Sequence, residues 1–320
     1  MKKMTGLLVV VSVSLGSLVP VYAMEPQVGD VIELELGQLK PTQSSIGYDQ
    51  IFYKLGRYHR DPKAMFDELC ESNGQKGVKH YTDVSLPNDN QSYQCKDEIG
   101  AHKDKMKTVV IGPDGQYFLT DGHHTFNVFY QMPNGGEKLR VNVLIDKDYR
   151  QWTDWPTFWG KMVAHGDAWL FDEQDRPIDY NQLPTKLGIS NFSDDQYRSL
   201  VYFVKGVAWY KPTQAIPFLE FYWARELRSL MEGSQFDLST QQGFRDALKV
   251  TSRNIVAIQS RDVGSSGMSA EQLGQWQKVD TKELEKLLKK KGKVTDALNY
   301  KAMSHEVFAR EAAGFEPENK

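Results

Sequence analysis

The sequence predicts an α+β protein in which a mixed region of strands and helices is followed by a mainly helical region. Two observations lead to this prediction. Between residues 28 and 145, short stretches with strand alternation are interleaved with helical stretches, whereas long helical periods dominate beyond residue 151. All seven tryptophans lie in this second region, six of them between Trp152 and Trp223. We therefore expect two units, at residues 24–150 and 151–320, after an N-terminal leader at residues 1–23.

The composition is that of an ordinary globular protein. The 320 residues are 40% hydrophobic and 12% aromatic, which is enough to form a sizeable core and excludes disordered, collagen-like and disulfide-dense classes. Lys and Arg number 39 against 42 Asp and Glu, for a net charge of -3 at pH 7. This balance excludes a strongly basic nucleic-acid binder but is compatible with a local basic groove.

The first 23 residues have the pattern of a secretory signal peptide. Lys2 and Lys3 precede an apolar stretch at residues 7–19, and a cleavage pattern ends at Ala23. A retained membrane anchor is the alternative interpretation. No later apolar stretch is long enough to cross a bilayer. We therefore expect an exported protein, periplasmic or secreted, with no membrane span after cleavage.

The two cysteines, Cys70 and Cys95, are interpreted in the light of export. In an oxidising compartment thiols tend to pair, which favours one disulfide between them. Two unpaired thiols and a metal site are the alternatives. The absence of a CxxC motif and of a matching histidine pair disfavours structural zinc.

The mature N-terminal part begins with a predicted strand and two predicted helices. Residues 28–39 have strand alternation, and Pro41 ends the strand. Helical spacing follows at residues 48–58, and Pro62 opens a second helix. The polar composition of residues 72–105 predicts a long surface loop.

A strand, hairpin, helix and strand unit follows. Residues 108–111 and 117–119 are predicted to pair across the tight turn Pro113-Asp114-Gly115. A helical pattern then runs to Met132, and residues 139–145 alternate again as a strand.

In the second region, apolar spacing predicts helices over residues 192–207, 215–231 and 242–258. Residues 282–293 form a lysine-rich amphipathic stretch, which we interpret as a solvated helix face, with a patch for an anionic partner as the alternative.

The most informative segment is TDGHHT, residues 120–125, at the predicted junction between strand and helix. A helix that starts here leaves its first backbone N–H groups unpaired at the positive end of its dipole, which is a natural position for phosphate. Asp121 can cap the helix or act as a base, and His123 and His124 can donate to phosphate or exchange protons near neutral pH. Walker-type, GxGxxG, GxSxG and HExxH motifs are absent.

Two segments resemble the ParB and sulfiredoxin superfamily, and more closely its secreted branch of ParB-like nucleases. One is TDGHHT, which occupies the place of the family's phosphate-binding box. The other is LKPTQSSIGYDQIFYK, residues 39–54, which is similar to the family's first motif. The resemblance implies a ParB/sulfiredoxin-like N-terminal domain over about residues 27–146, with the helical remainder as an extension.

The resemblance also implies an anion pocket between the two motifs. Gly122, Thr125 and the helix N-terminus would hold phosphate, with Gln43 and Lys54 on the other wall. The superfamily's partitioning proteins and sulfiredoxins carry an arginine at the end of this box, where this chain has Thr125. This difference argues against tight binding of nucleoside triphosphates.

The leading hypothesis is therefore an exported phosphodiester hydrolase acting on nucleic acid or another phosphoester. Asp121 or His124 would be the general base, His123 the acid or phosphate donor, and Lys54 would stabilise developing charge. A divalent metal such as Mg²⁺ could join Asp121 and one histidine, although no full ligand set is visible. The alternatives are a nucleotide-binding phosphotransferase and a non-catalytic envelope-binding protein.

Overall fold

The computed structural model describes the backbone of residues 25–312 and the side chains up to residue 304. The predicted signal peptide, residues 1–23, lies outside the described residues. Within residues 25–312, no helix combines the length and the apolar character needed to cross a bilayer.

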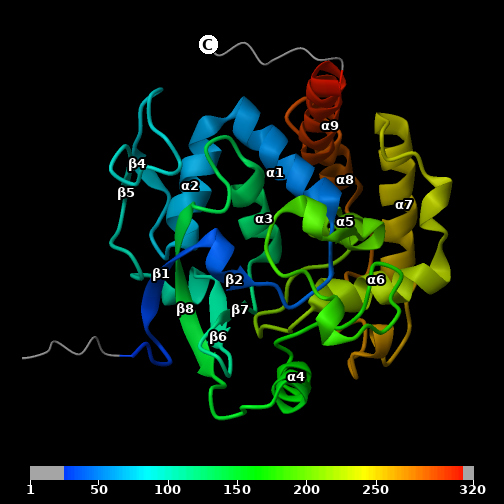
Figure 1. Cartoon of the computed structure of the whole chain (residues 1–320). Coiled ribbons are helices and arrows are strands. Elements are labelled where there is room, and N and C mark those ends of the chain that lie inside the picture. Colours follow the sequence, from blue (N-terminus) through cyan, green and yellow to red (C-terminus); the bar gives the residue numbers. More distant parts are fainter. Residues whose placement is uncertain (1–24, 313–320) are drawn as a thin grey trace, which may run out of the picture.

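A five-stranded mixed sheet forms the centre of the N-terminal half (Figure 1). Its strands lie in the order β1, β8, β6, β7 and β2. Strand β8 is antiparallel to β1 and parallel to β6, β7 is antiparallel to β6, and β2 is parallel to β7. The bounds are β1 Val31–Glu35, β2 Leu39–Lys40, β6 Thr108–Ile111, β7 Tyr117–Leu119 and β8 Arg140–Asp148.

Two pairs of short strands lie outside this sheet. One is parallel, β3 Ser45–Ile46 with β9 Ser193–Asp194, and the other is antiparallel, β4 Val78–His80 with β5 Gln94–Cys95. The β3–β9 pair joins the motif at residues 39–54 to the helical region.

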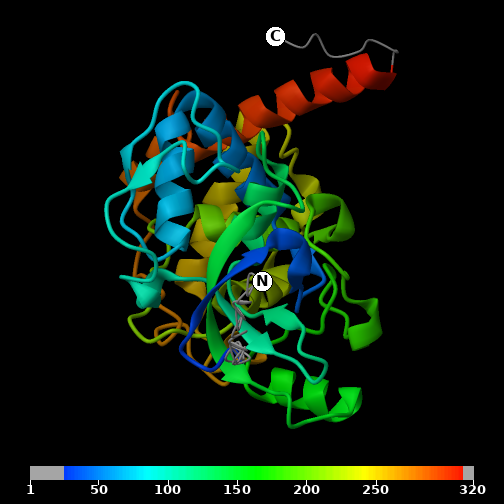
Figure 2. The same ribbon diagram turned by 60° about the vertical axis from the view of Figure 1, so that its left-hand side comes forward.

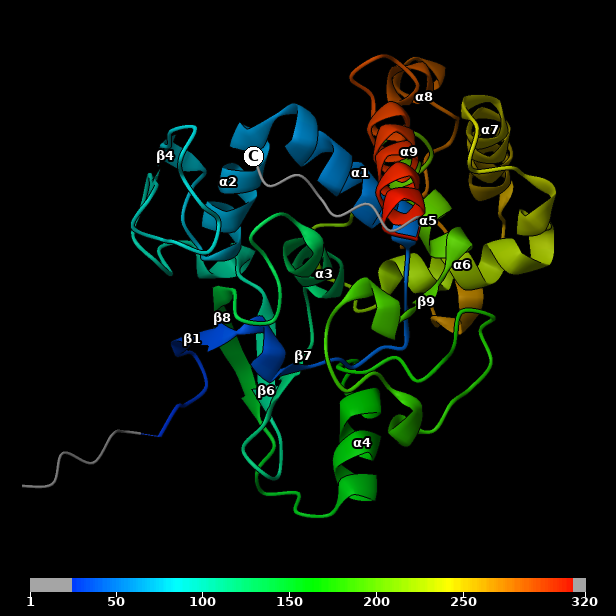
Figure 3. The same cartoon turned by 45° about the horizontal axis from the view of Figure 1, so that its top comes forward.

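Three helices cover the sheet, and α3 lies beside α1 (Figure 3). They are α1 Tyr48–Arg60, α2 Pro62–Ser72 and α3 His123–Gln131. Pro62 occupies the first turn of α2, where its missing N–H costs no hydrogen bond. Apolar side chains of these helices and of the sheet share one core that includes Leu39, Ile51 and Phe126.

The remaining described helices belong to the second half of the chain. They are α4 Trp155–Ala164, α5 Gln196–Phe203, α6 Leu219–Leu230, α7 Gln241–Ala257, α8 Thr281–Leu287 and α9 Lys293–Ala312. A second core, around the buried Trp209 and Trp223, packs α5 to α9 together. These two halves confirm the α+β prediction.

Helix α9 returns to the N-terminal half and packs along α1, beyond which it projects from the body (Figure 2). The close approach requires Gly56, because a Cβ there would lie 2.0 Å from the carbonyl oxygen of Asp296. Arg60 of α1 also pairs with Asp296 at 2.7 Å. Helix α9 therefore stabilises α1, whose first turns belong to the motif at residues 39–54.

The prediction of one continuous strand over residues 28–39 is wrong. Strand β1 ends at Glu35, and the chain makes one turn of 3-10 helix at Leu36–Gln38 before β2. The Gln38 side chain accepts a hydrogen bond from the Glu35 backbone N–H at 2.8 Å, which stabilises this turn. The helices predicted over residues 192–207 and 215–231 are shorter in the structure, as α5 and α6, and Pro217 precedes α6. The helix predicted over residues 242–258 has the expected length and begins one residue earlier, as α7.

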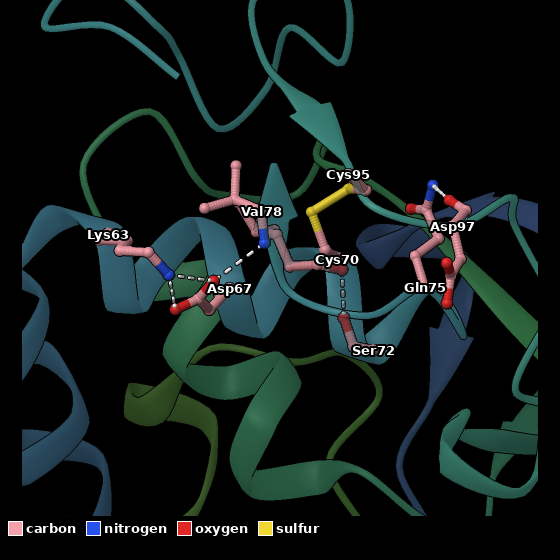
Figure 4. The surroundings of a disulfide bond; sticks show 9 residues. Lys63, Asp67, Cys70, Ser72, Gln75, Val78, Cys95 and Asp97 are labelled. Carbon is pink, nitrogen blue, oxygen red and sulfur yellow. Dashed lines mark hydrogen bonds and ion pairs between the residues drawn. A yellow bond between two sulfur atoms is a disulfide. The ribbon is translucent and has the colours of Figure 1, made fainter. Parts of the chain in front are cut away.

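A disulfide holds the long loop against α2. Cys70 of α2 is bonded to Cys95 of β5 (Figure 4). Nearby, Asp67 accepts hydrogen bonds from the Val78 backbone N–H at 2.9 Å and from Lys63. The loop at residues 72–105 is thus attached at several points of α2.

Candidate functional site

A cleft of about 560 Å³ opens between the start of α3 and the helical region. One side is formed by the β7–α3 junction at residues 120–125. Other walls come from residues 146–147 of β8, from residues 165–167 after α4, and from α5 with the start of α6. The predicted motif therefore lies at a boundary between the two halves of the chain.

Gly122 sets the geometry at the start of α3. It is the N-cap residue with φ of 109°, and an added Cβ would lie 2.8 Å from the Lys107 side chain. No side chain caps the helix. Among the described residues, the backbone N–H groups of His123, His124 and Thr125 have no acceptor. They are available to an anion.

His123 joins the two motifs inside the protein. Its Nε2 accepts a hydrogen bond from the Thr42 backbone N–H at 3.0 Å, and the Thr42 hydroxyl donates to the Leu119 carbonyl at 2.6 Å. Burial lowers the pKa of His123 to about 4, although Asp121 opposes this effect. His123 is therefore neutral at pH 7, with its proton on Nδ1.

His124 makes the equivalent contact one residue later. Its Nε2 accepts a hydrogen bond from the Gly47 backbone N–H at 3.0 Å. Burial, and then the positive charge of Arg198, hold the pKa of His124 well below its usual value. The Nε2 lone pair of each histidine is thus already occupied by a backbone donor.

Asp121 pairs with Lys107 instead of capping α3. The two side chains lie 3.1 Å apart, and the Asp121 side chain is 63% exposed. Desolvation opposes ionisation, but the charges of Lys107 and Lys211 outweigh it and lower the pKa of Asp121. Asp121 is an ionised carboxylate at the mouth of the cleft.

The other expected residues are divided between two places. Gln43 is buried, lines the cleft and donates to the Ser45 carbonyl at 2.7 Å. Thr125 also lines the cleft. Lys54 does not line it, because its ammonium group is paired with Glu68 of α2.

Arg198 of α5 is a site residue that the sequence analysis missed. Its side chain is 7% exposed and lines the cleft. It donates to the Gln50 side chain at 3.2 Å and lies 3.6 Å from Glu220. Its buried Nε has no hydrogen-bond partner. The guanidinium charge is therefore only partly satisfied by the protein.

Lys205 and Lys211 add positive charge to the same cleft. Within the described part of the chain, neither forms an ion pair with a carboxylate. Burial, opposed by Glu220 and reinforced by Lys211 and Arg198, lowers the pKa of Lys205. The chain thus gathers cations beside the unpaired amides of α3, which favours an anionic ligand.

The described side chains of the cleft do not form a complete set of metal ligands. Among the residues whose side chains are described, no group of three or more His, Cys, Asp or Glu side chains could hold a metal ion.

Comparison with family models gives a match over residues 32–229 to the family described as "Putative ParB-like nuclease". The matched range contains both motifs, the whole five-stranded sheet except Val31, and the helical region through most of α6. Arg198, Lys205 and Lys211 all lie within it.

Comparison with solved structures gives the fold alone. The crystal structure of protein Atu1540 from Agrobacterium tumefaciens is similar, with a TM-score of 0.51 and 21% identity. The similarity covers 78% of this chain and 100% of that chain. No curated protein sequence matches this chain.

Proposed function

Because the chain belongs to the ParB-like nuclease family, we propose that it hydrolyses phosphodiester bonds in the cleft at the start of α3. The family supports a nuclease-like function in general. The cleft residues, the substrate contacts and the export of the protein are the more specific parts of the proposal.

One observation carries the proposal: the uncapped N-terminus of α3 opens into the cleft that is also lined by Arg198, which the protein satisfies only in part, and by Lys205 and Lys211, which have no carboxylate partner among the described residues. A helix N-terminus favours negative charge, and a guanidinium binds phosphate oxygens through paired N–H donors. We call the amides of residues 123–125, together with Arg198, the anion seat. Lys205 and Lys211 would draw the polyanionic substrate toward it.

The motif side chains support the seat in different ways. His123 and His124 hold the segment Thr42–Gly47 through their Nε2 atoms, which makes them positioning residues. Their Nδ1–H groups have no acceptor among the described residues and can donate to a ligand. Asp121 orients Lys107 at the mouth of the cleft.

The site of action in this proposal is outside the cytoplasm. The leader pattern at residues 1–23 and the Cys70–Cys95 bond support an oxidising compartment, either periplasmic or extracellular. There, nucleic acid and other phosphodiesters are the accessible substrates. Intact mass of the exported protein tests this part, because cleavage after Ala23 leaves a chain that begins at Met24.

The function is tested with the purified mature protein on supercoiled plasmid, single-stranded DNA and a small chromogenic phosphodiester. Each assay is run with Mg²⁺, with Mn²⁺ and with EDTA. We expect cleavage of at least one substrate, and a fall of at least about tenfold in kcat/KM for Arg198→Gln. His59→Ala is the matched control, since His59 is exposed and lies outside the cleft.

Circular dichroism establishes that each variant is folded before its rate is compared. If Arg198→Gln does not fold, Lys107→Met removes another cation of the cleft, one that is less buried. A wild-type protein that matches buffer in every condition contradicts the hydrolase proposal. Binding of a nucleotide with transfer of its phosphate would instead favour the phosphotransferase.

A further inference from the structure

A separate wall of the cleft carries a connected set of polar side chains that no motif predicted. Lys147 lies near the end of β8 and Tyr149 directly follows that strand, while His165 and Asp167 follow α4. Lys147, His165 and Asp167 line the cleft, and Tyr149 is buried behind them. Only His165 of these four is strongly exposed.

The hydrogen bonds to Asp167 determine which atoms of this set donate and which accept. Lys147 donates to Asp167 Oδ1 at 2.6 Å, and the Tyr149 hydroxyl donates to Asp167 Oδ2 at 2.7 Å. An ionised carboxylate only accepts hydrogen bonds, so the single hydroxyl proton of Tyr149 is used here. Burial and this bond raise the pKa of Tyr149, which keeps the phenol protonated.

The tautomer of His165 follows from the fact that the Tyr149 hydroxyl donates its proton to Asp167. Its Nδ1 lies 2.7 Å from the Tyr149 hydroxyl oxygen. Since the hydroxyl proton is directed to Asp167, the oxygen accepts and His165 Nδ1 must donate. A neutral imidazole has one proton, so His165 Nε2 carries a lone pair, and no hydrogen-bond donor among the described residues occupies it. The lone pairs of His123 and His124 are instead occupied by backbone N–H groups.

We propose that His165 is the general base of the phosphodiester hydrolysis, and this inference rests on the proposed function. His165 Nε2 takes a proton from water, and the water oxygen bonds to phosphorus. The bond between phosphorus and the leaving oxygen breaks, and that oxygen takes a proton from bulk water. The imidazolium then returns its proton to bulk water, so one water is consumed for each bond cleaved.

Tyr149 and Asp167 are positioning residues in this arrangement. They hold the ring of His165 in one orientation and in one tautomer, as a buried carboxylate does for a catalytic histidine, here through a phenol. Asp121 is a poorer base, because its lowered pKa leaves it a weak proton acceptor near neutral pH.

The test measures cleavage of the substrate identified for the wild-type protein by His165→Ala, with and without added imidazole. We expect kcat to fall by about 100-fold or more, with partial recovery as imidazole fills the space of the missing ring. His59→Ala controls for the loss of an exposed histidine and is expected to keep the wild-type rate. If His165→Ala is misfolded by circular dichroism, His165→Asn replaces it.

Tyr149→Phe tests the positioning role. It keeps the ring but removes the hydroxyl, so we expect kcat to fall about tenfold with little change in KM, because the anion seat is untouched. A folded His165 variant that cleaves at the wild-type rate overturns this inference and leaves the proposed function standing. A wild-type protein without activity on any substrate overturns both.

Discussion

His124 Nε2 accepts a hydrogen bond from the backbone N–H of Gly47 at 3.0 Å, and so joins the first turn of α3 to the N-cap residue of α1. The neighbouring His123 makes the same kind of bond to Thr42. Two consecutive imidazoles therefore hold both ends of the segment that connects β2 to α1. Their first role in the fold is to accept hydrogen bonds from backbone N–H groups, which requires the Nε2 atom of each ring to be unprotonated.

Replacing His124 by alanine should destabilise the protein by about 1–3 kcal/mol, because the Gly47 N–H loses its acceptor in a largely buried place. Urea unfolding followed by circular dichroism measures the change. His59→Ala, an exposed histidine, should shift the free energy of unfolding by no more than about 0.5 kcal/mol. Equal midpoints for the two variants would show that the contact contributes nothing.

Stability should fall as the pH falls from about 6.5 toward 4, because His123 is neutral in the folded protein. Its folded pKa is about 4, below the usual 6.5, so the unfolded chain binds the proton more readily across this window. The stabilisation is complete above pH 6.5 and is lost as the pH approaches 4. The shift corresponds to about 3 kcal/mol, to be measured by urea unfolding at pH 7 and at pH 4.5.

His123→Gln is the matched variant for this pH dependence. Its amide oxygen can accept from the Thr42 N–H but does not titrate. We expect a smaller loss of stability between pH 7 and 4.5 than in the wild type, with the remainder due to His124 and to acidic groups. An unchanged pH profile would mean that His123 is not the group that titrates.

The elements best predicted from the sequence are those set by local patterns. The hairpin β6–β7 lies at the expected residues because Pro113-Asp114-Gly115 encodes the turn, and Gly115 has the positive φ of 80° that such turns use. The start of α3 likewise follows from Gly122. The sequence did not predict the break between β1 and β2. This break depends on the hydrogen bond from the Glu35 backbone N–H to the Gln38 side chain, which strand alternation does not indicate.

The missed part of the site depends on tertiary contacts. Arg198 and His165 belong to segments without a recognisable motif, and they reach the cleft only because α5 and the chain after α4 pack near α3. Nothing local distinguishes Arg198 from other helix arginines. Of the two binding residues expected from the first motif, Gln43 lines the cleft, whereas Lys54 is paired with Glu68.

Removing the disulfide by Cys70→Ala with Cys95→Ala should lower the free energy of unfolding by about 3 kcal/mol, the loop-entropy expectation for a closed loop of this length. The bond spans 25 residues and fixes β5 to α2. Thermal unfolding of the wild type with and without reductant measures the same effect. The double variant should not respond to reductant, and a wild type that is equally unresponsive would contradict the contribution of the bond.

Lys211→Ala should weaken the binding of an anionic substrate without affecting the fold. Lys211 is exposed at the cleft and has no carboxylate partner among the described residues, so its charge acts on the ligand. A loss of about 1 kcal/mol raises KM about fivefold at low salt, and the difference should shrink at high ionic strength as the charge is screened. Lys282→Ala is the control, because Lys282 is exposed on α8 and lies outside the cleft. Equal KM values for the two variants at low salt would show that Lys211 does not contribute to substrate binding. A rise in KM confined to Lys211→Ala would support electrostatic attraction of the substrate to the start of α3.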